Sequence, residues 1–163
     1  MNDHAKRAVF LALSAELTGY SETDLEGTGN VDAYHALVDE QCGPVIRDMF
    51  YAAAEGVLQA KGAAARADAM RVDVLASPTV WPLCQAIISL WYLGTWTTPA
   101  TAWYLGAGGT VPAGVTPGTT VVPSAQAYTA QLAYRAAGAH PPGANPTGHG
   151  SWSLDPVFGD FLK

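Results

Sequence analysis

The chain has 163 residues, with 14 Asp and Glu against 8 Lys and Arg and a formal net charge of −6 at neutral pH. This length is enough for one domain with a substantial core. The acidic balance excludes most nucleic-acid-binding proteins, because contact with a phosphate backbone needs clustered Lys and Arg.

The first predicted helix spans residues 4–18. Its apolar face repeats at helical spacing through Phe10, Leu13, Ser14 and Leu17. Gly19 follows in the position where a glycine commonly ends a helix. Residues 20–29 are polar and contain two glycines, so we expect a connection there.

Two further helices are predicted on either side of Gly43. Asn30 is placed to cap the first of them, and Gly43 stops it. Pro44 then starts the next helix at the one position where proline costs little. The apolar stripes are Val31, Tyr34, Leu37 and Val38 in one helix, and Val45, Ile46, Met49, Phe50, Ala53 and Val57 in the other.

Three more helical segments are predicted later in the chain. An Ala-rich segment covers residues 63–75. Ser77 and Pro78 then start a helix that Gly94 ends, and its residues 83–93 are apolar almost all round, as in a central buried helix. The last predicted helix spans residues 125–137, with Ser124 as its cap.

The most unusual feature is the absence of charge between residues 74 and 134. These 61 residues contain no Asp, Glu, Lys or Arg and hold all but one of the five Trp residues. A soluble domain has about a quarter of its residues charged, so roughly 15 would be expected over this length. Charges keep a water-facing surface from associating, so we expect part of this stretch to be covered by another protein chain.

We divide the uncharged stretch and the end of the chain by composition. Residues 77–94 are expected to be the central helix of the chain's own core. Residues 95–123 contain four prolines and many threonines and predict a long loop that faces a partner. Residues 139–163, rich in Pro and Gly, predict an extended arm.

The predicted fold class is therefore all-α. We expect residues 1–163 to form a single domain, a small irregular bundle of about five to six helices with one long loop and a C-terminal arm. Cys42 and Cys84 lie in no metal-binding motif and are interpreted as two buried thiols, with one disulfide between them as the alternative.

Neither a signal peptide nor a membrane span is predicted. The early apolar run at residues 8–13 is too short for a leader. The run at residues 80–96 is interrupted by Pro82, Gln85, Ser89 and Gly94 and falls short of about 20 apolar residues.

No catalytic constellation is found in the sequence. There is no GxSxG elbow, no HExxH motif and no P-loop. Of the histidines, His35 lies beside a buried face, while His140 and His149 are nine residues apart without a third ligand nearby. The acidic pairs at 39–40 and 22–26 predict solvated surface, so we expect no enzyme activity, no cofactor and no metal site in this chain.

An uncharged aromatic surface without catalytic residues is typical of an interaction subunit, because Trp and Tyr dominate the binding energy at the centres of buried interfaces. The predicted interface residues are Trp96, Trp103, Tyr104, His140, Pro141, Pro142 and Trp152.

Several short motifs resemble one known family. They are Phe10-Leu-Ala-Leu-Ser-Ala-Glu-Leu-Thr-Gly19, Trp91-Tyr-Leu-Gly94, Ala137-Gly-Ala-His-Pro-Pro-Gly143, Gly150-Ser-Trp152 and Asp155-Pro156. Together they resemble the small subunit of membrane-associated, flavin-dependent sugar and sugar-alcohol dehydrogenases. That family includes glucose, fructose, sorbitol and glucoside 3-dehydrogenase complexes and relatives of the gluconate dehydrogenase small subunit.

The resemblance implies a non-catalytic subunit that binds, stabilises and helps to export a large GMC-type flavoprotein. In this family FAD belongs to the large subunit, a cytochrome c subunit can be present, and the complex lies on the periplasmic side of a bacterial inner membrane. The small subunit often carries a twin-arginine leader, from which Lys6-Arg7 departs. A cytoplasmic location is therefore the alternative.

Two other functions remain open from the sequence. The uncharged aromatic surface suits a stand-alone protein that binds a sugar or another ligand with an apolar face. It also suits an obligate homo-oligomer that uses this stretch as its own interface.

Overall fold

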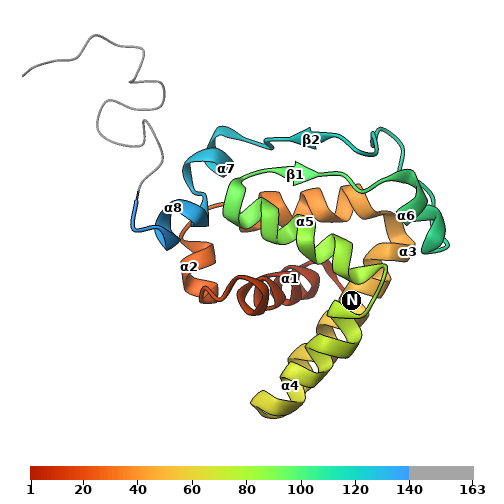
Figure 1. Cartoon of the computed structure of the whole chain (residues 1–163), viewed down its shortest axis with the longest axis horizontal. Helices are drawn as coiled ribbons and strands as arrows, with labels where there is room; N and C mark the ends of the chain where they lie inside the picture. Colours follow the sequence, from red (N-terminus) through yellow and green to blue (C-terminus); the bar gives the residue numbers. More distant parts are fainter. Residues whose placement is uncertain (140–163) are drawn as a thin grey trace, which may run out of the picture.

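The computed structural model describes residues 1–139, and the predicted all-α class is confirmed. In chain order the elements are α1 (Asp3–Thr18), α2 (Glu22–Glu26), α3 (Val31–Gln59), α4 (Ala63–Ala69), the π-helix η1 (Met70–Leu75), α5 (Val80–Leu93), β1 (Trp96–Thr97), α6 (Thr101–Gly106), β2 (Thr120–Val121), α7 (Ala125–Thr129) and α8 (Leu132–Ala136). Figure 1 shows α5 crossing in front of α3, with α1 below it and the β1–β2 hairpin above it.

Helix α1 begins and ends as its sequence predicts. The Asn2 side chain accepts a hydrogen bond from the backbone of Ala5, which satisfies one of the free amides in the first turn. Gly19 ends the helix with φ at 75°, a left-handed geometry that glycine adopts without steric cost. The side chains of α1 that are buried in the core are Phe10, Leu11, Leu13, Ser14 and Thr18.

The segment that was predicted as a connection contains the short helix α2. Ser21 caps it, and the Asp24 side chain returns a hydrogen bond to the Ser21 backbone, forming a capping box. Leu25, its one buried side chain, joins the core with no exposed surface.

Helix α3 is one continuous run with a sharp break, at the residues where the sequence predicts two helices. Gly43 has φ 70° and ψ 168°, outside helical geometry, and Pro44 follows it. The break leaves carbonyl groups of the preceding turn without helical partners. The Tyr104 hydroxyl donates a 2.8 Å hydrogen bond to one of these, the carbonyl of Gln41, so α6 is anchored at the kink.

The Ala-rich segment forms a projecting arm. It comprises α4 and η1, and of their side chains Val74 is the buried one. In Figure 1 α4 extends away from the other helices beside the end of α3. An arm of this kind adds little to the core.

Helix α5 is central, as predicted. Ser77 accepts a hydrogen bond from the Val80 amide, and Pro82 lies within the first turn, where its missing N–H costs nothing. The buried side chains of α5 are Val80, Leu83, Cys84, Ala86, Ile87, Leu90 and Trp91. They pack against α1, α3 and η1 on one side of the helix.

The predicted long loop is closed by a hairpin that the sequence analysis did not predict. Trp96 pairs with Val121 and Thr97 with Thr120 in an antiparallel ladder. Two more backbone hydrogen bonds of 2.9 Å, from Thr98 to Thr119 and from Gly118 to Thr98, extend the pairing beyond the strands. The ends of the loop are therefore held together at α5.

The predicted single helix over residues 125–137 is wrong, because the chain breaks into α7 and α8. Gln131 between them has ψ at 128°, which is extended geometry. Ala127 and Leu132 are both fully buried, and α7 and α8 both contact α5. In one continuous helix these two residues, five apart, would point about 140° away from each other, so the break lets both face α5.

Within the described part of the chain, no single helix is long and apolar enough to cross a membrane. The segments Ala63–Leu75 and Val80–Leu93 reach that threshold only as a pair, and the pair is bent by 103°.

Candidate functional site

The outward face of α5 is hollowed and uncharged. Val80 to Trp91 bury one side of the helix, while Gln85 and Leu93 on the other side are exposed. A hollow of about 460 Å³ runs along this outer face. It is lined by Trp81, Gln85, Ile88, Ser89, Tyr92 and Leu93.

A second hollow of about 480 Å³ adjoins the first, and both are lined by Gln85 and Ser89. Its other walls come from α5, β1 and α6: Pro82, Ala86, Thr97, Pro99, Ala100 and Trp103. We call the two hollows together the α5 groove. Every residue that lines the α5 groove is uncharged.

The polar groups along the α5 groove are held in place. The Ser89 and Thr95 hydroxyls share a 3.1 Å hydrogen bond. The Tyr92 hydroxyl donates to the Thr18 carbonyl at 2.8 Å, and the Trp103 indole N–H donates to the Thr79 carbonyl at 2.9 Å. The aromatic rings are therefore fixed before anything binds, which lowers the entropic cost of association.

The structure places the predicted interface residues in environments of different burial. Trp103 lies half-buried in a wall of the α5 groove, with surface left to contact a partner. Trp96 and Tyr104 are fully buried in the chain's own core, so the prediction that they face a partner is corrected. The strand β1 packs against α5, where Trp96 is fully buried, and the hydrogen bond to the α3 kink holds Tyr104 inward.

The remaining predicted interface residues are His140, Pro141, Pro142 and Trp152. All four lie outside the residues that the structure describes.

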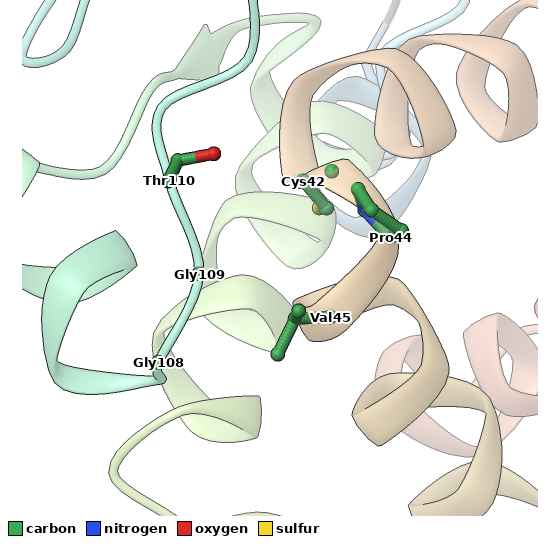
Figure 2. Close-up of a pocket in the computed structure, with 7 residues that line it drawn as sticks. Cys42, Pro44, Val45, Gly108, Gly109 and Thr110 are labelled. Atoms are coloured by element: carbon green, nitrogen blue, oxygen red, sulfur yellow. The ribbon is translucent and has the colours of Figure 1, made fainter.

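A smaller pocket of about 120 Å³ lies at the kink of α3 (Figure 2). The loop of Gly108, Gly109 and Thr110 forms one wall, and Cys42 and Val45 on either side of the kink contribute to the other. Its volume is enough for a few atoms, and the pocket brings together no pair of acid and base. We interpret it as a packing gap where the loop meets the kink.

Cys42 and Cys84 are free thiols in the structure, so the alternative prediction of a disulfide between them is not supported. Both are buried. Burial raises the pKa of Cys84 to about 12 and that of Cys42 further, because an apolar site disfavours the thiolate. Neither thiol is suited to nucleophilic chemistry at neutral pH.

A polar network lies within α3 and connects the parts of the helix before and after its kink. His35, interpreted from the sequence as an ordinary hydrogen-bonding histidine, pairs with the Tyr51 hydroxyl at 3.0 Å. That hydroxyl donates to Asp39, also at 3.0 Å. Burial, reinforced by the negative charge of Asp39, raises the pKa of Tyr51 well above its usual range.

Asp3, His35 and Asp39 bring one possible metal ligand each to within 4.8 Å of one another. Lys6 and Arg47, each 3.9 Å from Asp39, already balance its charge. A divalent ion would have to compete with both cations, so we interpret the cluster as a structural link between α1 and α3.

Two acidic residues of α2, Asp24 and Glu26, have lowered pKa values. Ser21, and then Arg135, lower the pKa of Asp24 by hydrogen bonding to its carboxylate. Arg7 lowers the pKa of Glu26 in the same way. A carboxyl group with a lowered pKa is poorly suited to act as a general acid.

The sequence analysis does not predict most of the α5 groove, because residues 83–93 are apolar almost all round in sequence. Gln85, Ser89 and Tyr92 mark the outer face at spacings of four and three residues. That spacing was the available signal. A comparison of the chain with known proteins finds no matching family model, curated protein or solved structure.

Proposed function

We propose that this chain is a non-catalytic small subunit that binds a larger protein through the α5 groove. The observation that carries the proposal is the groove itself: an uncharged, aromatic face on the central helix of an otherwise acidic chain. Contiguous exposed apolar surface rimmed by polar residues is a recognised feature of protein interaction sites.

Exposed apolar side chains continue beyond the α5 groove. Leu93 is 53% exposed, Leu105 on α6 is 62% exposed, and Val121 and Val122 in and after β2 are about half exposed. All four belong to the uncharged stretch. A binding partner that covers the groove and the hairpin would remove them from water, at about 25 cal/mol per Å² of apolar area.

The kind of partner rests on the family resemblance. We propose the large FAD-containing subunit of a sugar or glycoside dehydrogenase, a GMC-type flavoprotein, with a cytochrome c subunit as a further member of the complex. The small subunit would stabilise the flavoprotein and assist its export to the periplasmic side of the membrane. FAD would be bound by the partner.

Two of the motifs behind the resemblance meet in the core of this chain. Phe10, in the first motif, stacks on Trp91, in the second, with ring centroids 6.4 Å apart. Both are buried, so these motifs specify the packing of α1 on α5. A family that keeps this helical core would need both motifs for that reason.

Co-expression tests the proposal. The gene for this chain is expressed alone and together with a gene for a GMC-type flavoprotein, and soluble yield and co-purification are measured. We expect the pair to purify as a complex with bound flavin, and in higher soluble yield than the chain expressed alone. A well-behaved monomer that gains nothing from the flavoprotein would contradict the proposal.

Matched variants localise the interface. Gln85→Lys and Leu93→Lys each place a charge in the α5 groove at an exposed position. Burying a lysine without a partner is costly, so we expect co-purification to fall at least about tenfold. Ala36→Lys, exposed on α3, adds the same charge away from the groove and should bind as the natural chain does.

A homo-oligomer would use the same groove. Mass measurement of the purified chain distinguishes it, because Gln85→Lys would then convert an oligomer into a monomer without any flavoprotein present.

A further inference from the structure

We propose that residues 140–154 of this same chain bind in the α5 groove when no partner protein covers it. The inference concerns the free chain and does not depend on the identity of the partner. It starts from where the described part of the chain ends and from the chemistry of the groove.

The described chain ends beside the Tyr92 end of the α5 groove. The Arg135 guanidinium of α8 lies 5.5 Å from the centre of the Tyr20 ring. That ring lies 6.2 Å from the ring of Tyr92, which lines the groove. Ala139 is held close to α8 by a 2.8 Å hydrogen bond to the Tyr134 carbonyl. The segment that follows Ala139 therefore starts near one end of the groove.

The segment is long enough to cover the groove. Trp152 lies thirteen positions after Ala139, and an extended chain advances about 3.3 Å per residue, or roughly 43 Å in all. The 14 residues of α5 span only about 21 Å at 1.5 Å each. Trp152 can thus reach any point of the α5 groove without strain.

The chemistry of the segment matches that of the groove. Residues 140–154 carry no Asp, Glu, Lys or Arg, so burying them leaves no uncompensated charge from these groups. The prolines at 141, 142 and 146 favour the polyproline II conformation, which docks into grooves lined by aromatic rings. The α5 groove supplies three such rings, Trp81, Tyr92 and Trp103, with the Gln85 amide between them as a hydrogen-bonding group.

Trp152 is the anchor that we expect in the groove. It is the only tryptophan outside the uncharged stretch, and the next charged residue, Asp155, follows three positions later. Charge thus reappears just beyond the part of the segment that would be buried. A partner that uses the α5 groove would compete with this segment for the same surface.

Disulfide trapping in the full-length chain tests this inference. Ser153→Cys beside the anchor is combined with Gln85→Cys in the groove, and the rate of cross-linking under mild oxidation is followed by peptide mass mapping. A free tether gives roughly millimolar effective concentration at every position it can reach. We expect docking to make the groove pair react at least about tenfold faster than that. The native Cys42 and Cys84 are buried and do not compete.

Ser153→Cys combined with Ala36→Cys is the matched control. Ala36 is exposed on α3, and this helix begins close to α7, where Gln126 bonds the Thr28 carbonyl at 2.8 Å, so the tether reaches it. Adding Pro141→Ala and Pro142→Ala to the groove pair should lower its rate severalfold. Equal rates at Gln85 and Ala36 would overturn the inference, as would a groove disulfide formed only between two copies.

These outcomes are separable from the proposed function. Trapping uses the isolated chain, whereas the co-purification test uses the flavoprotein. If the segment docks but no flavoprotein binds, only the proposed function is refuted. If the flavoprotein binds but the segment does not dock in the free chain, only the present inference is refuted.

Discussion

Gly94 connects the central helix to the C-terminal helices through a very close backbone contact. It ends α5 with φ at 62°. A Cβ atom at this position would lie 2.4 Å from the carbonyl oxygen of Ala127, which is fully buried in α7. Both the left-handed geometry and the contact require glycine here.

Gly94→Ala should therefore destabilise the fold by about 2–4 kcal/mol, from backbone strain and from the displaced α7. Urea unfolding followed by circular dichroism measures this change. Gly19→Ala is the matched control, since Gly19 has φ at 75° but open space around it. The control should cost only about 1 kcal/mol. Equal losses in the two variants would show that the contact with Ala127 is unimportant.

Two tryptophan side chains differ in burial although the sequence does not distinguish them. From the sequence, Trp96 and Trp103 are equivalent candidates for an interface, seven residues apart in the same uncharged stretch. In the structure Trp96 is fully buried while Trp103 lines the α5 groove. The strand β1 that contains Trp96 packs against α5 and pairs with Thr120 and Val121 more than 20 residues later, and no local pattern predicts these contacts.

At the scale of elements, α5 has two faces of different roles. Its inner face is built from large apolar residues and packs on α1, α3 and η1. Its outer face carries Gln85, Ser89 and Tyr92 and remains half open. The uncharged stretch therefore does not divide at residue 94, as predicted from composition. The division runs along the length of α5.

The α3 kink and helix α6 form a second unit. Tyr104→Phe removes the hydroxyl that bonds the Gln41 carbonyl and leaves that carbonyl without this partner at the kink. We expect a loss of about 1–2 kcal/mol in the free energy of unfolding. Hydrogen exchange should also show faster opening of residues 101–112. Leu105→Ala, at an exposed position of the same helix, should change stability by less than about 0.5 kcal/mol, and a similar loss there would contradict the assignment.

At the scale of the whole molecule, surface ion pairs link α1, α2, α3 and α8. Arg7 forms ion pairs with Glu26 and Asp32, and Arg135 pairs with Asp24 at 3.1 Å. These pairs join elements that are far apart in the sequence. They lie at the surface, so each contributes little alone and is weakened by salt.

The lowered pKa values of Asp24 and Glu26 predict how stability depends on pH. Since both groups bind protons less readily in the folded chain than in the unfolded one, their contribution is present above their ordinary pKa values of 3.8 and 4.5. It is lost as the pH falls through the lowered values. Thermal unfolding between pH 7 and pH 2 should show this loss. Arg7→Gln should flatten the part due to Glu26, and an unchanged acid profile would argue against the pairing.

The sequence by itself determined most of the helices and the chemical character of the surface. Helix ends at Gly19, Gly43 and Gly94 depend on local backbone preferences, so they were predicted correctly. The absence of charge between residues 74 and 134 is likewise a property of the chain alone.

Only the tertiary structure decided which uncharged side chains face inward. The strand that contains the buried Trp96 pairs with β2, the position of Tyr104 depends on a hydrogen bond across 63 residues, and the break between α7 and α8 depends on their packing against α5. Each is a contact between segments distant in the sequence, and local propensity carries no information about such contacts. The α5 groove exists because these contacts cover one face of the helix and leave the other open.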